Sequence, residues 1–272
     1  MSTLDAACAR ARAWLDRHQN ADGSWGYRPG QPGAGEPTLL AAAAGLRPSL
    51  SWLEEAELGW SRLMAPVCLQ SHAEAAAFRA QTVDHILDHK GTGGETAGSF
   101  DGDLPGWPWV EGTFSWVEPT AWAVHSLRAV GDPTDPRVVE RVTGGLAVLA
   151  DRQCTDGGWN AGTPDILGSE LFGYLYLTGL VLSALPRGHA AVRGAQRFLL
   201  DVVKRPSPLN LSWAILGGEV HGFGSSEWVE RLCAAQDADG GFSGRVDRTA
   251  LALCALSVAV GGTSVLAPKP RR

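Results

Sequence analysis

Two kinds of helical segment alternate along this chain. The first kind is apolar on one face only, with charged residues such as Arg141 and Asp151 opposite, and comprises residues 4–18, 136–152 and 226–235. The second kind is apolar nearly all round and comprises residues 39–46, 120–130, 171–185 and 249–260. Because a helix that is apolar on every face must be buried on every face, the pattern predicts an inner layer of helices surrounded by an outer one.

The intervening sequence extends this alternation. Less regular helical patterns cover residues 53–64, 72–90, 189–203 and 210–220, and no segment shows the alternation typical of a strand. With about eleven helical stretches and a pair every roughly 45 residues, we expect an all-α fold, an α/α toroid of about six hairpins. We assign residues 1–264 to this single domain and residues 265–272 to a basic C-terminal tail.

A seven-residue pattern recurs three times where an amphipathic segment ends. The three copies are Gln19–Trp25, Gln153–Trp159 and Gln236–Phe242. Each copy has a Gln, an Asp-Gly turn three residues later, and an aromatic residue two positions after that glycine. Glycine permits the tight turn, the Gln amide can satisfy free backbone groups at a helix end, and the aromatic ring can cover the junction. The pattern therefore predicts a repeated helix-to-helix connector, in which the three aromatic residues are structural.

The composition of the chain indicates which classes of binding partner and which cellular compartment to expect. The chain has 272 residues, a formal net charge of −6 and no extended basic run, which argues against nucleic acid. Its five cysteines are scattered without a Cys-x-x-Cys pair, which favours a reducing, cytoplasmic compartment. We expect no signal peptide, and the apolar run 171–185 is shorter than the roughly 20 residues that span a bilayer. Peripheral membrane contact stays compatible with this composition, and the oligomeric state is left open.

One long connection interrupts the alternation of helices. Residues 91–116 are rich in glycine and also contain Asp101, Asp103, Trp107 and Trp109. Because long connections in compact domains are often functional, we expect this segment to fold over one mouth of the toroid.

At its connectors the chain resembles the terpenoid cyclase and protein prenyltransferase superfamily, whose α/α toroids carry Gln…Gly-x-Trp repeats called QW motifs. By motif it is most similar to squalene-hopene cyclases, although those have two such helical domains and this chain has room for one. The resemblance implies a class II cyclase, which protonates an alkene in a dry cavity and stabilises the resulting carbocation with aromatic rings. It implies no metal and no cofactor.

The resemblance also points to a proton donor. In the family this acid is the middle Asp of an Asp-x-Asp-Asp-Thr-Ala stretch at the start of an inner helix. The matching stretch here is 116–121, in which Glu118 falls on the donor while Trp116 and Pro119 replace the flanking aspartates. We therefore take Glu118 as the candidate catalytic acid, with Asp101 and Asp103 as candidates to replace the missing acids. His125, further along the same helix, completes the candidate catalytic set.

A purely structural interpretation of Glu118 stays open beside this one. Two other apolar helices also open with an acid two residues before a threonine, at Glu36 and Asp247. An acid in the first turn interacts favourably with the helix dipole, and Pro suits the first helical position. The repeated acid-x-Thr pattern is therefore also typical of a helix start.

Aromatic residues supply the candidate substrate-binding set. It consists of Trp107, Trp109, Phe114, Trp116, Trp122, Phe172, Tyr174, Tyr176 and Trp213. Together these residues suit an apolar, isoprenoid-like small molecule, whereas core packing is the alternative for each one. His85 and His89 are spaced like metal ligands on a helix, but with no third ligand evident we assign them to the solvated surface.

These observations favour a small terpene cyclase-like enzyme that cyclises a linear isoprenoid by proton donation from Glu118. The first alternative is a non-catalytic toroid that binds an apolar ligand or a partner protein. The second is a protein similar to a prenyltransferase β subunit, which the absence of an Asp-x-Cys zinc-binding pair disfavours.

Overall fold

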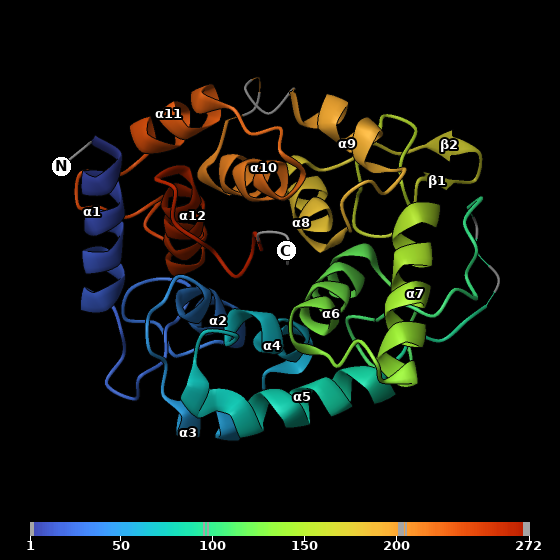
Figure 1. The fold of residues 1–272 in the computed structure, drawn as a ribbon, viewed down its shortest axis with the longest axis horizontal. Helices are drawn as coiled ribbons and strands as arrows, with labels where there is room; N and C mark the ends of the chain where they lie inside the picture. The colour runs from blue at the N-terminus through green and yellow to red at the C-terminus, as the bar shows by residue number, and fades with distance from the viewer. Residues whose placement is uncertain (1–2, 95, 97, 201–203, 205, 269–272) are drawn as a thin grey trace.

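The inner helices pack side by side into a closed ring, which makes the protein an α/α toroid (Figure 1). The computed structural model describes residues 3–94, 96, 98–200, 204 and 206–268. The inner helices are α2 (Gly35–Ala43), α4 (Ala65–Cys68), α6 (Val117–Val130), α8 (Leu175–Ala184), α10 (Pro208–His221) and α12 (Val246–Ala259). Each inner helix contacts the next one along the chain, and α12 contacts α2, so the ring is complete.

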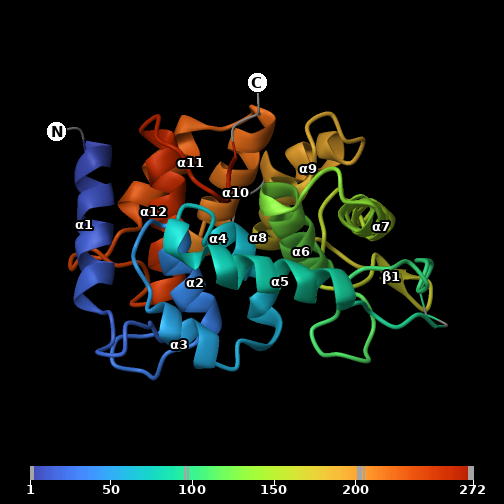
Figure 2. The same cartoon turned by 60° about the horizontal axis from the view of Figure 1, so that its bottom comes forward.

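An outer layer of helices surrounds this ring, as the alternating pattern predicts. The outer helices are α1 (Thr3–Arg17), α3 (Leu50–Glu55), α5 (Ala76–Asp88), α7 (Pro136–Asp151), α9 (Val192–Leu199) and α11 (Ser226–Ala234). Two 3₁₀ helices, η1 (Gly59–Met64) and η2 (Ala73–Ala75), flank α4. A two-stranded antiparallel hairpin, β1 (Asp165–Ile166) and β2 (Ser169–Glu170), lies in the connection between α7 and α8. The long connections that lead into α2 and α6 lie on one side of the ring, together with β1 (Figure 2).

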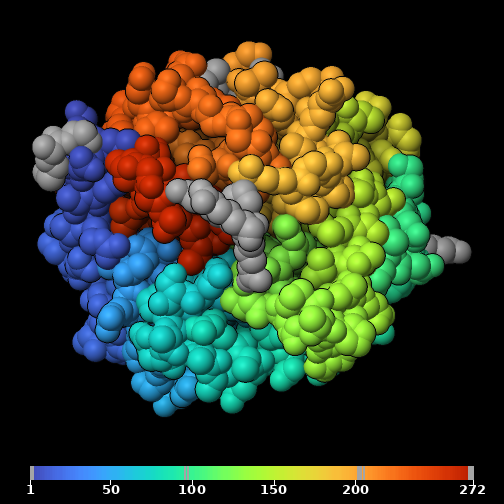
Figure 3. Space-filling view, in the orientation of Figure 1, coloured from blue at the N-terminus to red at the C-terminus, as the bar shows by residue number. Residues whose placement is uncertain are grey.

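The three Gln-containing connectors adopt one geometry. The Nε2 amide of Gln153 donates to the carbonyl of Gly157 at 2.8 Å and to that of Ala191, at the start of α9, at 3.0 Å. The equivalent bonds run from Gln19 to Gly23 and Arg47, and from Gln236 to Gly240 and Ala7. Each glutamine therefore closes its own turn and binds the hairpin that follows. The last of them binds α1, so that first and last hairpins adjoin in the ring (Figure 3).

The aromatic residue of each connector is bonded to a threonine of the next inner helix. Four such bonds, from a backbone N–H to a threonine Oγ1 at 2.9–3.0 Å, join Trp25 to Thr38, Trp107 to Thr120, Trp159 to Thr178 and Phe242 to Thr249. The indole N–H of Trp107 also donates to a carbonyl of the preceding outer helix, as those of Trp25 and Trp159 do. Trp107, which we expected to bind substrate, is therefore the buried aromatic residue of a fourth connector.

The chain beyond α12 turns back into the ring. The carbonyl of Val265 lies 3.3 Å from Nε2 of His125 on α6, across the ring from α12. Leu266 is fully buried and Ala267 is 3 % exposed, although both lie in the stretch 265–272 that we predicted to be a basic C-terminal tail. Residues 264–267 therefore pack against the core of the toroid. Residues 269–272 of the expected tail lie outside the described residues.

Helix α7 holds part of the 91–116 connection on the outer rim of the toroid. Arg141 of α7 donates to the carbonyl of Pro105 at 2.9 Å, and the carboxylate of Asp151 accepts from the backbone N–H of Asp101 at 3.1 Å. Arg141 is buried by these contacts, although its position in the amphipathic pattern predicts solvent exposure. Among the described residues, no helix has the length and apolar character needed to cross a membrane.

Candidate active site

The threonine bonds of the connectors fix which residues face one another at the ring axis. Each bonded threonine lies in the first turn of its inner helix, so the residue two positions before it occupies an equivalent place in every repeat. These four equivalent residues are Glu36 on α2, Glu118 on α6, Tyr176 on α8 and Asp247 on α12. We call them the axial cluster. The sequence repeat thus brings three acids and a phenol to one end of the ring.

Glu118 is the member of the axial cluster with the most perturbed acidity. Burial, followed by repulsion from the carboxylate of Glu36, raises the pKa of Glu118 from 4.5 to about 8. The residue nevertheless keeps part of its surface exposed. Glu118 is therefore a carboxyl group that holds its proton at neutral pH while part of its surface remains exposed.

Glu36 is the acidic residue whose charge raises the pKa of Glu118, and it has a hydrogen-bond partner of its own. The phenol of Tyr27 donates to Oε2 of Glu36 at 2.7 Å. Burial raises the pKa of Glu36, the bond from Tyr27 lowers it, and repulsion from Asp247 raises it. Glu36 and Glu118 therefore form a pair of carboxyl groups that disfavour double ionisation.

A salt bridge balances the third acid of the cluster. Arg245 binds Asp247 through two parallel hydrogen bonds, Nε to Oδ1 and Nη2 to Oδ2, each 2.9 Å long. The guanidinium carbon of Arg245 also lies 5.1 Å from the ring centre of Tyr27, which links this bridge to Glu36. Bidentate pairs of this kind hold the carboxylate in a fixed orientation.

Tyr176 completes the cluster on the side of α8. Burial, and then the charge of Glu118, raise the pKa of Tyr176 to about 12, so its hydroxyl stays protonated. Its ring stacks on that of Tyr174 with 6.2 Å between the centres. The axial cluster thus offers a protonated phenol beside a protonated carboxyl group.

The structure does not bring Asp101 and Asp103 together with Glu118. Both aspartates are exposed on the rim, where the N–H of Asp103 donates to the carboxylate of Asp101 at 2.9 Å and Asp101 is bonded to Asp151 of α7. The charged neighbour that acts on the pKa of Glu118 is Glu36, on helix α2. The expectation that loop aspartates replace the flanking acids is therefore wrong.

His125 lies two turns beyond Glu118 along α6, about 10 Å further along the helix axis. Burial lowers the pKa of His125 to about 4, so the imidazole is neutral. Its Nε2 bonds to Val265, and its Nδ1 has no hydrogen-bond partner among the described residues. His125 therefore anchors the C-terminal segment rather than the axial cluster.

The candidate substrate-binding aromatics are dispersed rather than gathered around one cavity. Trp122 and Trp213 are buried within the ring and make an edge-to-face contact, with 5.5 Å between their centres. Trp109 makes a similar contact with Trp60 of η1, at 4.6 Å. Phe114, Phe172 and Tyr174 are exposed, Trp116 lines a separate rim pocket, and Trp107 belongs to a connector. Of the candidate aromatic residues, Tyr176 has a pKa that the charge of Glu118 raises.

Four residues of this site were absent from the sequence-based candidates. Glu36 and Asp247 carry the same acid-x-Thr signal as Glu118, but that pattern is equally typical of a helix start. Both acids lie two residues before the threonine that is bonded to their connector, as Glu118 does, and this shared position could have placed them with Glu118. Tyr27 and Arg245 carry no comparable signal, because they lie in the irregular ends of two connectors.

Comparisons with known proteins bear on the fold. No protein-family model and no curated protein matches the chain. Two solved structures of single-residue variants of a glycosidase are similar to it. Each has a TM-score of 0.59 and covers 98 % of both chains, and the identities are 13 % and 12 %. The type II terpene cyclase MstE from Scytonema matches with a TM-score of 0.41 and 13 % identity over 96 % of this chain and 99 % of that one. At such identities the likeness to the glycosidases shows the toroid fold alone.

Proposed function

We propose that this protein is an enzyme in which Glu118 donates a proton to the substrate. The observation that supports the proposal is the state of this carboxyl group, which is partly exposed, adjoins Glu36 and has a pKa of about 8. A general acid works best when its pKa lies near the working pH, because it is then both protonated and able to release its proton.

The carboxyl pair at the axis favours cleavage of a glycosidic bond as the reaction. Glycoside hydrolysis uses one protonated carboxyl group to donate to the leaving oxygen, and a second carboxylate to activate water or to attack the sugar. Glu118 supplies the first group, and Glu36, oriented by Tyr27, supplies the second. Asp247 and Arg245 add fixed polar groups, which suit a hydroxyl-rich substrate.

Acid-initiated cyclisation of a linear isoprenoid, the reaction implied by the sequence resemblance, is the second candidate. The observation in its favour is the Trp122–Trp213 pair, which lies deeper in the ring than Glu118 and presents aromatic rings that stabilise a carbocation. Protonation of an alkene, however, demands a stronger acid than protonation of an oxygen atom. A pKa of about 8 therefore favours the glycosidic reaction.

The two reactions are distinguished by their products. The purified protein is incubated with a panel of 4-nitrophenyl glycosides, and separately with farnesyl and geranylgeranyl diphosphate and squalene. Released nitrophenol is followed by absorbance, and hydrocarbon products by gas chromatography–mass spectrometry. Glu118→Gln is the test variant, and Glu140→Gln, at an exposed position on α7, is its matched control.

Nitrophenol release that Glu118→Gln abolishes and Glu140→Gln preserves is the expected result. A cyclised product with the same dependence on Glu118 establishes the second candidate instead. If neither substrate class reacts, or if Glu118→Gln is fully active, the proposed proton donor is wrong and a non-catalytic, ligand-binding toroid is favoured.

A further inference from the structure

A separate pocket of about 240 Å³ opens on the rim of the toroid, between the 91–116 connection and the residues around β1. We call it the rim pocket. Its principal lining residues are Phe100, Phe114, Trp116, Arg152, Thr163 and Ile166. No member of the axial cluster lines it, so the rim pocket is a site distinct from the candidate active site.

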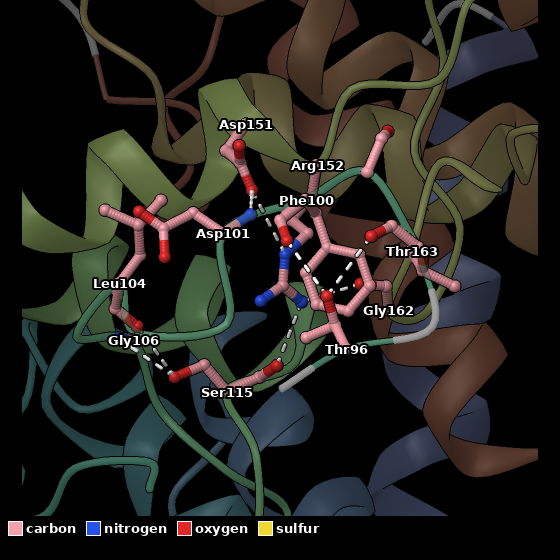
Figure 4. Close-up of polar contacts among 12 residues, drawn as sticks. Thr96, Phe100, Asp101, Leu104, Gly106, Ser115, Asp151, Arg152, Gly162 and Thr163 are labelled. Atoms are coloured by element: carbon pink, nitrogen blue, oxygen red, sulfur yellow. Dashed lines mark hydrogen bonds and ion pairs between the residues drawn. The ribbon is translucent and has the colours of Figure 1, made fainter. Parts of the chain in front are cut away.

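A buried arginine builds the rim pocket. The side chain of Arg152 is 2 % exposed, and its Nη1 donates to the carbonyls of Ser115 at 3.1 Å and Gly162 at 2.6 Å (Figure 4). These two acceptors belong to the two connections that form the opposite sides of the pocket. Because one guanidinium bonds both, the walls are held in place before any ligand arrives, which reduces the entropic cost of binding.

Aromatic stacking and charge balance complete the surroundings of Arg152. The ring of Phe100 covers the guanidinium, with 4.0 Å between the guanidinium carbon and the ring centre. The carboxylate of Asp151 lies 3.5 Å from Nε and balances the positive charge. The charge of Arg152 is therefore compensated inside the protein. Asp165 also lines the pocket, and its carboxylate accepts hydrogen bonds from the backbone N–H and the hydroxyl of Ser99.

The walls above Arg152 expose apolar surface to water. Phe114 is 44 % exposed and Ile166 is 45 % exposed, and both line the pocket. Large exposed apolar side chains that line a preformed pocket are typical of a ligand site, because a ligand removes their surface from water.

We propose that the rim pocket binds the ring system of a small aromatic compound of about two fused rings. A cavity of roughly 150 Å³ holds one benzene molecule, so 240 Å³ has room for a larger, bicyclic ring system. The indole of Trp116 and the phenyl groups of Phe100 and Phe114 favour a flat π-electron face over an aliphatic one. This proposal is independent of the reaction at Glu118.

Isothermal titration calorimetry with 2-naphthol tests this inference, and its saturated analogue decahydro-2-naphthol is the control ligand. Ile166→Asn is the test variant. Leu167→Asn is its matched control, because Leu167 is the adjacent residue, is 84 % exposed and does not line the pocket. Its φ of 49° is a left-handed conformation that Asn tolerates.

We expect one 2-naphthol site per chain, with affinity lowered about fivefold or more by Ile166→Asn and unchanged by Leu167→Asn. We expect decahydro-2-naphthol to bind at least about fivefold more weakly than 2-naphthol, because it lacks a π face. The inference is overturned if 2-naphthol does not bind the folded protein or if the two variants weaken it equally. Equal affinity for the saturated analogue overturns the preference for aromatic rings. Circular dichroism of both variants verifies that they are folded.

Discussion

Replacement of Glu118 by Gln should stabilise the protein at neutral pH. Gln has nearly the shape of a protonated Glu, so the variant keeps the packing and removes only the ionisable group. In the unfolded chain Glu118 ionises with its ordinary pKa of 4.5, whereas in the folded protein burial and Glu36 raise that pKa to about 8. Between these values the folded state binds one more proton than the unfolded state, so stability falls as pH rises.

The size of this effect follows from the two pKa values. The folded state loses about 1.4 kcal/mol of stability per pH unit, which amounts to about 3 kcal/mol between pH 4.5 and pH 7. The contribution of Glu118 is fully present below pH 4.5, declines through neutral pH and levels off above pH 8. Glu118→Gln should therefore match the wild type near pH 4 and exceed its stability by about 3 kcal/mol at pH 7.

Urea unfolding followed by circular dichroism between pH 4 and pH 9 measures this difference. We expect the difference between the free energies of unfolding of the two proteins to increase with pH and to level off near pH 8. Parallel stability profiles for the wild type and Glu118→Gln would refute the reasoning, because they would mean that Glu118 titrates normally in the folded state. Glu36→Gln serves as a second probe. It removes the repulsive neighbour, so the pKa of Glu118 should fall and the difference should level off at lower pH.

Three further predictions concern the scaffold and are measured by urea unfolding. Thr120→Val removes the acceptor of the Trp107 N–H and should lower the free energy of unfolding by about 1–3 kcal/mol. The control Thr143→Val, on the exposed face of α7, should change it by less than about 0.5 kcal/mol. Equal effects of the two variants would contradict a special role for the connector bond. Leu266→Ala leaves a cavity beneath the C-terminal segment and should cost about 2–5 kcal/mol, so a neutral effect would show that this segment does not pack in the ring. Gly157→Ala should lower the free energy of unfolding by more than about 1 kcal/mol, because φ is 90° there and a Cβ would meet the backbone oxygen of Gly194 at 2.6 Å. An unchanged midpoint of urea unfolding would contradict this turn geometry.

The layered architecture was predictable because apolar periodicity reports burial directly. Helix starts were less predictable. The apolar run 120–130 misses the first turn of α6, which begins at Val117, because Glu118 and Pro119 do not continue the apolar pattern. Helix α4 was missed because its four residues, Ala65–Cys68, are too few to show a helical period.

The candidate site was predictable only in part. The resemblance selected Glu118, but the assembly of the axial cluster depends on closure of the ring, which brings α2, α6 and α12 together from distant parts of the chain. The position of Asp101 and Asp103 depends on Arg141 and Arg152, two arginines that are buried by loop carbonyls. An amphipathic pattern assigns such arginines to solvent, so the sequence alone could not place the loop.

The bond between Gln236 and Ala7 has a consequence for how this protein acquires its shape. Linear repeat proteins need special terminal repeats to cover their exposed ends, whereas here the last repeat covers the first. This contact spans 229 residues of sequence, so its loop-closure entropy is large and it should form after the local hairpins. Before the ring closes, the partly folded molecule is an open arc with an exposed apolar surface at each end. Because the joined ring has no intrinsic beginning, circular permutants opened at another inter-hairpin turn should reach the same fold.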